Sequence, residues 1–173
     1  MVRASVIMTI LNEGESIERT IMKIASQLPE GGEIVVVDAG SSDNTLSVLK
    51  DMVERGIPLK WLQVPGCSRG MGRNVAIKEC SNDIIVVIDG GCEPLNGWYQ
   101  ALTEPFAKLG GPDVVGGYWE PTANSVYGQA VGGYTSSVVP SMHAKEFLPS
   151  SRCVAFKKQV WEAVGGYPDE NVG

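Results

Sequence analysis

The chain alternates between short apolar runs and longer segments in which an apolar residue recurs every three or four positions. The clearest apolar runs cover 4–10, 34–37, 59–64 and 84–88. A β-branched run, then a polar turn, then an apolar stripe with a period near 3.6 is typical of a strand–helix–strand unit. Repetition of this unit predicts an α/β protein with a mainly parallel central sheet.

The segments between these runs predict helices, because their apolar residues fall on one stripe. The predicted helices cover 17–28, 46–53 and 73–79, the last of them after a loop over 65–72. Pro29 and Gly56 mark the ends of the first two, since proline cannot continue a helix and glycine suits its C-cap.

The pattern is weaker in the second half of the chain. It predicts a helix over 97–109, a strand over 114–119, and a final strand and helix over 153–156 and 160–164. Residues 122–149 show no clear period and are predicted to form a loop region. Because we find neither an internal repeat nor a linker, we expect a single domain over 1–173.

Composition narrows the class of protein. The chain has 173 residues, of which 43% are hydrophobic and 20% charged, with a mean hydropathy of +0.01, as in an ordinary globular domain. The net charge of -6 comes without any basic run, so we expect no nucleic-acid partner. The apolar runs are far shorter than the roughly 20 residues that cross a bilayer, so no membrane span is expected in this chain.

The four cysteines form no Cys-x-x-Cys pair. This spacing argues against a zinc ribbon and a thioredoxin-type motif. We therefore expect reduced thiols and a cytoplasmic protein.

Single acidic residues follow two interior strands, Asp38 after 34–37 and Asp89 after 84–88. Ligands of open α/β sheets bind at this carboxyl edge. The chain has neither a P-loop nor a GxGxxG fingerprint, so other groups must hold the ligand. A carboxylate there can accept from a base N–H, bind ribose hydroxyls or hold a metal, and it can equally cap the following turn. Position alone does not decide between these roles.

Several motifs, taken in order and spacing, resemble the family-2 glycosyltransferases. The segments are SVIMTILNE (5–13), IVVVDAGSSDNT (34–45), SRGMGRNVAI (68–77), VVIDGGC (86–92), SRCVAF (151–156) and VGGYPDE (164–170). The resemblance covers nearly the whole chain. It implies the GT-A fold, a Rossmann-like three-layer α/β/α sandwich that binds a nucleotide-diphosphate sugar.

The resemblance also implies roles for residues at the nucleoside end of the site. It places Thr9, Leu11 and Glu13 beside the nucleoside, with Thr9 offering mainly backbone atoms. Asp38 would accept a base N–H, and Arg73 would reach the base or the diphosphate. From the residues alone, Glu13 can also be read as a first-turn acid of the helix that follows, and Arg73 as a solvated residue in the first turn of its own helix.

Asp89 would contact the ribose or a metal, yet the family's DxD element reads Asp89-Gly90-Gly91 here. This chain therefore has a glycine at the position where the resemblance implies the acid that holds the divalent cation. Because Mg²⁺ is often held by one or two carboxylates and substrate phosphates, Mg²⁺ or Mn²⁺ remains a candidate cofactor. Its protein ligand would be Asp89, alone or with Glu93.

The implied reaction is transfer of a sugar from a UDP- or GDP-sugar to a hydroxyl of a saccharide or lipid-linked acceptor, with inversion, as in cell-wall or polysaccharide biosynthesis. A full-length protein would act in the cytoplasm, including the inner face of the membrane. Asp169 and Glu170 match the acids of the family's GGFDE segment rather than its general base, which we expect beyond Gly173. We therefore expect this chain to be the nucleotide-sugar-binding part, with the acceptor part missing and the catalytic residue unassigned.

Two other functions stay open. A nucleotidyltransferase that makes the activated sugar has a related sheet, but the glycine-rich basic loop it needs after the first strand is absent. A donor-binding fragment without catalysis of its own is the non-enzymatic reading.

A few further residues are weaker candidates. His143 is the single histidine, and no Ser or Cys partner for a triad is identifiable. The tryptophans Trp98, Trp119 and Trp161 are predicted to be core or pocket wall, with Trp119 able to face the acceptor. The resemblance places 150–152 on the acceptor side.

Overall fold

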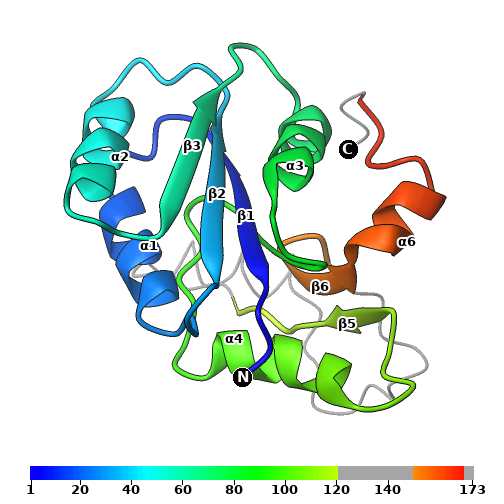
Figure 1. Ribbon diagram of the computed structural model, residues 1–173. Coiled ribbons are helices and arrows are strands. Elements are labelled where there is room, and N and C mark those ends of the chain that lie inside the picture. The colour runs from blue at the N-terminus through cyan, green and yellow to red at the C-terminus, as the bar shows by residue number, and fades with distance from the viewer. Residues whose placement is uncertain (121–149, 170–173) are drawn as a thin grey trace.

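A six-stranded sheet forms the centre of the computed structural model, which describes residues 1–120 and 150–169 (Figure 1). In chain order the elements are β1 (Ser5–Ile10), α1 (Ile17–Ala25), β2 (Glu33–Asp38), α2 (Thr45–Glu54), β3 (Leu59–Gln63), α3 (Arg69–Glu79), β4 (Ile84–Ile88), α4 (Trp98–Thr103), the 3-10 helix η1 (Glu104–Ala107), β5 (Val114–Gly116), β6 (Cys153–Lys157) and α6 (Lys158–Ala163). The loop predicted over 122–149, His143 and Glu170 lie outside the described residues.

The strand order is β3-β2-β1-β4-β6-β5. Strands β1 to β4 are parallel, whereas β6 is antiparallel to both β4 and β5. The prediction of a mainly parallel sheet is confirmed. The chain builds outward from β1 through β2 to β3 and then returns to add β4 on the other side of β1. This reversal puts a topological switch point between the carboxyl ends of β1 and β4, where open sheets bind ligands.

Two apolar cores, one on each face of the sheet, confirm the three-layer arrangement. In β1, Val6 and Met8 face the core shared with α1, α2 and α4, while Ile7 faces the core shared with α3. The same alternation occurs in β2 and β4, because successive side chains of a strand point to opposite faces. Figure 1 shows α1 and α2 on one side of the sheet and α3 on the other.

The main difference from the predicted elements lies at the start of α3. The helix begins at Arg69 rather than at Arg73, because Ser68 is its N-cap and accepts a hydrogen bond from the Met71 N–H at 3.0 Å. Arg73 is therefore in the second turn, and its reading as a solvated first-turn residue is wrong. The helix predicted over 97–109 is shorter in the structure. Helix α4 ends at Thr103, and the 3-10 helix η1, which contains Pro105, follows it.

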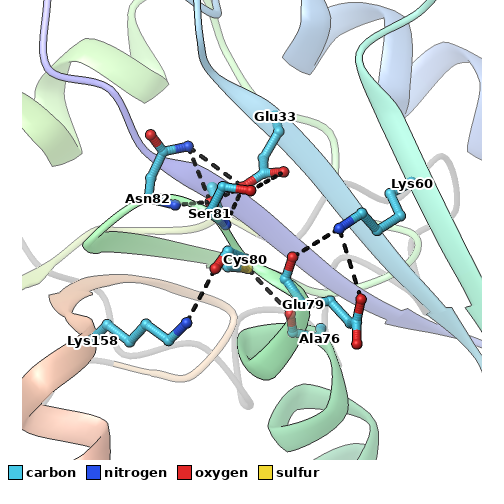
Figure 2. A network of polar contacts seen from close by, with 9 residues as sticks. Glu33, Lys60, Ala76, Glu79, Cys80, Ser81, Asn82 and Lys158 are labelled. Carbon is cyan, nitrogen blue, oxygen red and sulfur yellow. Dashed lines mark hydrogen bonds and ion pairs between the residues drawn. The ribbon is translucent and has the colours of Figure 1, made fainter.

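A polar network closes the edge of the sheet opposite the switch point (Figure 2). The Glu33 carboxylate accepts hydrogen bonds from the Ser5 hydroxyl and the Ser81 N–H, both at 2.6 Å. Asn82 donates its side-chain N–H to the same Ser5 oxygen at 3.2 Å. The network thereby fastens the connection between α3 and β4 to the first residues of β1 and β2.

Two lysines extend these contacts to β3 and α6. Lys60 donates to the Glu79 carbonyl at 2.9 Å, and Lys158 donates to the Cys80 carbonyl at 3.1 Å. Both carbonyls belong to the C-terminal end of α3, where the last carbonyls of a helix lack partners within the helix. Burial raises the pKa of the Cys80 thiol to about 12, so this thiol stays protonated, and it donates to the Ala76 carbonyl at 3.1 Å.

The cysteines at 67, 80, 92 and 153 are free thiols. No helix among the described residues has the length and apolar character needed to cross a bilayer.

Replacing Glu33 with Ala should lower the free energy of unfolding by about 1–3 kcal/mol, because the fully buried Ser5 hydroxyl and the Ser81 N–H lose their acceptor. Urea unfolding followed by circular dichroism measures this change. The exposed Glu30 supplies the matched Glu30→Ala control, which should change the stability little. Equal effects of the two substitutions would show that the network does not contribute.

Candidate functional site

The turns that follow β1 and β2 are locked together at the carboxyl edge of the sheet. The Asn12 N–H donates to the Ser41 hydroxyl, and the Ser42 N–H donates to the Asn12 side-chain oxygen, both at 2.8 Å. Asn12 has a φ of 56°, a left-handed conformation that asparagine tolerates better than most residues. Leu11, just before it, is 53% exposed and lies open at this edge.

Asp38 ends β2, is fully buried, and organises the turn after this strand. Its Oδ2 accepts hydrogen bonds from the N–H groups of Gly40 and Ser41 at 3.0 and 2.9 Å and from the Gln63 side chain at 3.1 Å. Its Oδ1 accepts from the Ser41 hydroxyl. These are the contacts of the turn-capping alternative. A base N–H would have to reach a carboxylate that already has several donors.

Arg73 and Asp89 form an ion pair at the switch point between β1 and β4. The Arg73 Nη2 lies 2.5 Å from the Asp89 Oδ1, and the two side chains are only 8% and 15% exposed. The same guanidinium contacts the Ser151 carbonyl at 3.4 Å and lies over the Tyr167 ring, 5.2 Å from its centroid. Burial raises the pKa of the Tyr167 phenol, and the charge of Arg73 opposes this rise.

A close contact between α3 and β1 brings Arg73 to this position. A Cβ added at Gly72 would lie 2.5 Å from the Thr9 Cγ2, so only glycine lets the helix approach this strand. The Thr9 hydroxyl also donates to the Arg69 carbonyl at 3.5 Å. Thr9 is thus a packing partner of α3, and its backbone lies at the carboxyl edge.

Glu13, in the turn after β1, lies beside the Asp89-Gly90-Gly91 turn after β4. This contact brings two of the predicted site segments together. The Glu13 Oε1 would be 2.9 Å from a Cβ added at Gly90, and its Oε2 accepts from the Ser16 hydroxyl at 2.6 Å. Helix α1 begins at Ile17, after the N-cap Ser16, so Glu13 precedes the helix and its reading as a first-turn acid is wrong.

All six predicted site residues therefore belong to the carboxyl edge of the sheet, although they do not all meet. Direct contact joins Arg73 with Asp89, and Glu13 approaches the turn after Asp89. The partners of Asp38 lie in its own turn and in β3. Their roles toward a ligand stay predictions.

The family model for glycosyl transferase family 2 matches residues 5–147, more than half of the chain. The chain belongs to this family. Glycosyltransferase AglE of Haloferax volcanii is 31% identical over an alignment of 175 positions, which covers 95% of this chain and 56% of AglE.

Solved structures share the GT-A fold of the family at lower identity. The mannosyltransferase PcManGT of Pyrobaculum calidifontis, in complex with GDP-Man and Mn²⁺, has a TM-score of 0.73 and 20% identity over 97% of this chain and 48% of its own. TarS 1–349 of S. aureus has a TM-score of 0.68 and 19% identity over 98% and 51%. The chain spans about half the length of the family members it matches.

Mn²⁺ is present in some of the similar glycosyltransferase structures, and a comparable site in this chain would need carboxylates free to bind a divalent cation. Position 91 is a glycine, and both Asp89 oxygens face guanidinium groups, Arg73 at 2.5 Å and Arg152 at 3.8 Å. Glu93 pairs with Lys23 and Arg19 on α1. No group of three or more His, Cys, Asp or Glu side chains suited to a metal occurs within 1–120 and 150–169. This donor set does not fit the metal site of a DxD element.

Asn74 fastens the segment after α6 to α3, a role that the sequence analysis missed. Its side-chain N–H donates to the Tyr167 carbonyl at 2.8 Å and to the Asp169 carboxylate at 3.2 Å. Its oxygen accepts from the Tyr167 N–H at 2.8 Å and from the Trp161 indole at 2.9 Å. The available signal was an asparagine in the middle of a helix, where its side chain often bonds elsewhere. Asn74 thus holds the backbone of Tyr167, whose ring lies against the Arg73 guanidinium.

The tryptophans have different surroundings. Trp98 and Trp161 pack against the two cores, in agreement with the prediction of core or pocket wall. Trp119 instead lies against the Arg152 guanidinium, and the distance from the Arg152 Cζ to the centroid of the Trp119 ring is 4.6 Å.

Replacing Asp38 with Asn should lower the stability of the ligand-free protein by about 1–3 kcal/mol, because an amide N–H₂ would replace an oxygen that accepts from N–H groups. Urea unfolding without nucleotide measures the loss. Asp51, exposed on α2, provides the Asp51→Asn control. Unchanged stability of Asp38→Asn would contradict the turn-organising role and favour a role in ligand contact alone.

Replacing Asn74 with Ala should release the segment 165–169 from α3, because the backbone carbonyl and N–H of Tyr167 lose their hydrogen-bond partner. We expect faster amide hydrogen exchange in this segment, measured by mass spectrometry, with little change in β1 and β2. The neighbouring Lys78→Ala on the exposed side of α3 is the control. Equal exchange in Asn74→Ala and the wild type would contradict the clamp.

Proposed function

We propose that this chain binds a nucleoside-diphosphate sugar at the carboxyl edge of its sheet, and that the full-length protein transfers the sugar to an acceptor hydroxyl with inversion. Family membership supports the reaction class. The structures with similar folds include complexes with GDP-Man, UDP and UDP-GlcNAc, which support a UDP- or GDP-linked donor. The acceptor is proposed to be a saccharide or lipid-linked hydroxyl.

The buried Arg73–Asp89 pair is the observation that carries this proposal. Taking two charges out of water costs several kcal/mol per ion unless the pair and its hydrogen bonds compensate. Here the pair lies at the switch point, beside the Asp89-Gly90-Gly91 turn, rather than inside one of the two apolar cores. A rigid carboxylate at this place can accept hydrogen bonds from ribose hydroxyls.

The nucleoside end is proposed to lie across the turns after β1 and β2. The exposed Leu11 offers an apolar surface to a base, and the backbone near Thr9 offers hydrogen-bonding groups. Asp38 acts on this face through the turn that it holds. Glu13, next to Gly90, would lie between the nucleoside and the phosphates.

Sugar transfer develops negative charge on the departing diphosphate, and fixed positive groups there lower the barrier. Arg73 is paired with Asp89, so its proposed part is to hold that carboxylate in place. Asp169 is not assigned as the general base, because its carboxylate accepts from Asn74 and its carbonyl accepts from the Ser68 hydroxyl. The residue that deprotonates the acceptor is proposed to belong to the part of the full-length protein that this chain does not span.

A thermal-shift screen with UDP, GDP, dTDP and their sugars tests donor binding. A ligand at about 100 times its dissociation constant stabilises by roughly 2.7 kcal/mol, or about 5–10 °C in a protein of this size. We expect one base to raise the melting temperature of the wild type and Asp89→Asn to lose this rise, while Asp51→Asn keeps it. No shift with any nucleotide would contradict the proposal, and release of pyrophosphate from a nucleoside triphosphate and a sugar 1-phosphate would favour a nucleotidyltransferase.

A further inference from the structure

Asp89 is shared by two arginines that come from different elements. The antiparallel pairing of β4 with β6 aligns Ile88, the last residue of β4, with Cys153, the first residue of β6. The residue that follows β4 therefore lies next to the residue that precedes β6. These residues are Asp89 and Arg152, and the Arg152 Nε lies 3.8 Å from the Asp89 Oδ2. The other carboxylate oxygen already pairs with Arg73. Two guanidinium groups thus share one carboxylate, so these three side chains together carry a charge of +1.

Arg152 is held in place although it is accessible. Its guanidinium lies over the Trp119 ring at 4.6 Å, within the range of a cation–π contact. Its side chain is 44% exposed, against 8% for Arg73. Arg73 is therefore the buried structural partner of Asp89, whereas Arg152 presents the excess charge to solvent at the switch point.

A divalent cation bound to Asp89 would meet two like charges. Each Asp89 oxygen faces a guanidinium group within 4 Å, so a metal at either oxygen would be repelled by its neighbours. The glycine at position 91 supplies no second carboxylate, and Glu93 is paired on α1. The accessible cation beside Asp89 is Arg152.

We propose that Arg152, fixed by Trp119 and Asp89, binds the diphosphate of the donor in place of a divalent cation. A guanidinium group suits this task because its planar N–H groups match phosphate oxygens in pairs. The assignment moves Arg152 from the acceptor side, where the family resemblance placed it, to the donor phosphates. It rests on the proposed function, since it concerns the same ligand, and it makes donor binding by this chain independent of metal.

Isothermal titration with GDP and UDP, in EDTA and in Mn²⁺, tests the proposal on the purified chain. We expect the wild-type affinity in EDTA to lie within about threefold of that in Mn²⁺. Arg152→Gln should weaken diphosphate binding about tenfold or more, the size typical of a lost charged hydrogen bond. The corresponding monophosphates, GMP and UMP, should lose much less, because the contact is made to the diphosphate.

Arg55→Gln is the matched control, because Arg55 also pairs with carboxylates and its side chain is 43% exposed, but it lies at the end of α2. It should bind as the wild type does. Arg152→Lys should fall between Arg152→Gln and the wild type, because the charge stays and the planar group is lost. Circular dichroism and the melting temperature of each variant confirm that it folds.

Several outcomes would overturn the proposal. Loss of binding in EDTA, restored by Mn²⁺, would show that a metal holds the diphosphate, and loss of that metal effect in Glu13→Gln would identify Glu13 as its ligand. Equal affinities of Arg152→Gln and the wild type, or equal losses for monophosphate and diphosphate, would remove Arg152 from the diphosphate contact. If the wild type binds no nucleotide in either buffer, the proposed function itself fails.

Discussion

The buried ion pair between Arg73 and Asp89 is the contact on which the carboxyl edge of the sheet depends. It joins the second turn of α3 to the end of β4, and the Ser151 carbonyl before β6 and the Tyr167 ring after α6 lie against the same guanidinium. Removal of one partner of such a pair leaves an uncompensated charge and typically costs about 3–5 kcal/mol. The pair therefore fixes where four separate segments meet, and it does so at the place where an open sheet binds its ligand.

The two ends of the proposed site are stabilised by different means. At the nucleoside end, Asp38 is buried and holds a turn through hydrogen bonds, and Asn12 links this turn to the one after β1. At the phosphate end, charges are paired across strands, and Arg152 keeps an accessible face. The first arrangement gives a rigid surface with backbone groups near the ligand, and the second gives a fixed positive charge.

The relation to the glycosyltransferase family lies in the sequence match and the fold. The family match and the similar solved structures cover nearly all of this chain but only about half of their own length. The departure at Gly91 and the paired oxygens of Asp89 change the electrostatics of the DxD element, because a carboxylate surrounded by arginines no longer attracts a second cation. A guanidinium and a metal ion can serve the same phosphate, since both supply fixed positive charge.

The sequence by itself determined the strands and the mainly parallel sheet, and it pointed to the edge of the proposed site, because apolar periodicity encodes which side chains face a core. It placed Asp89, Arg73 and Glu13 at that edge, and the structure brings Arg73 into contact with Asp89 and Glu13 beside the turn after it. Only the tertiary structure decided that Asp38 serves its own turn, that Asn74 clamps the segment after α6, and that Arg152 meets Asp89. The sequence left turn capping by Asp38 open as one of several roles, whereas the contacts of Asn74 and Arg152 join residues far apart in the chain. No local pattern specifies which distant polar side chains will meet.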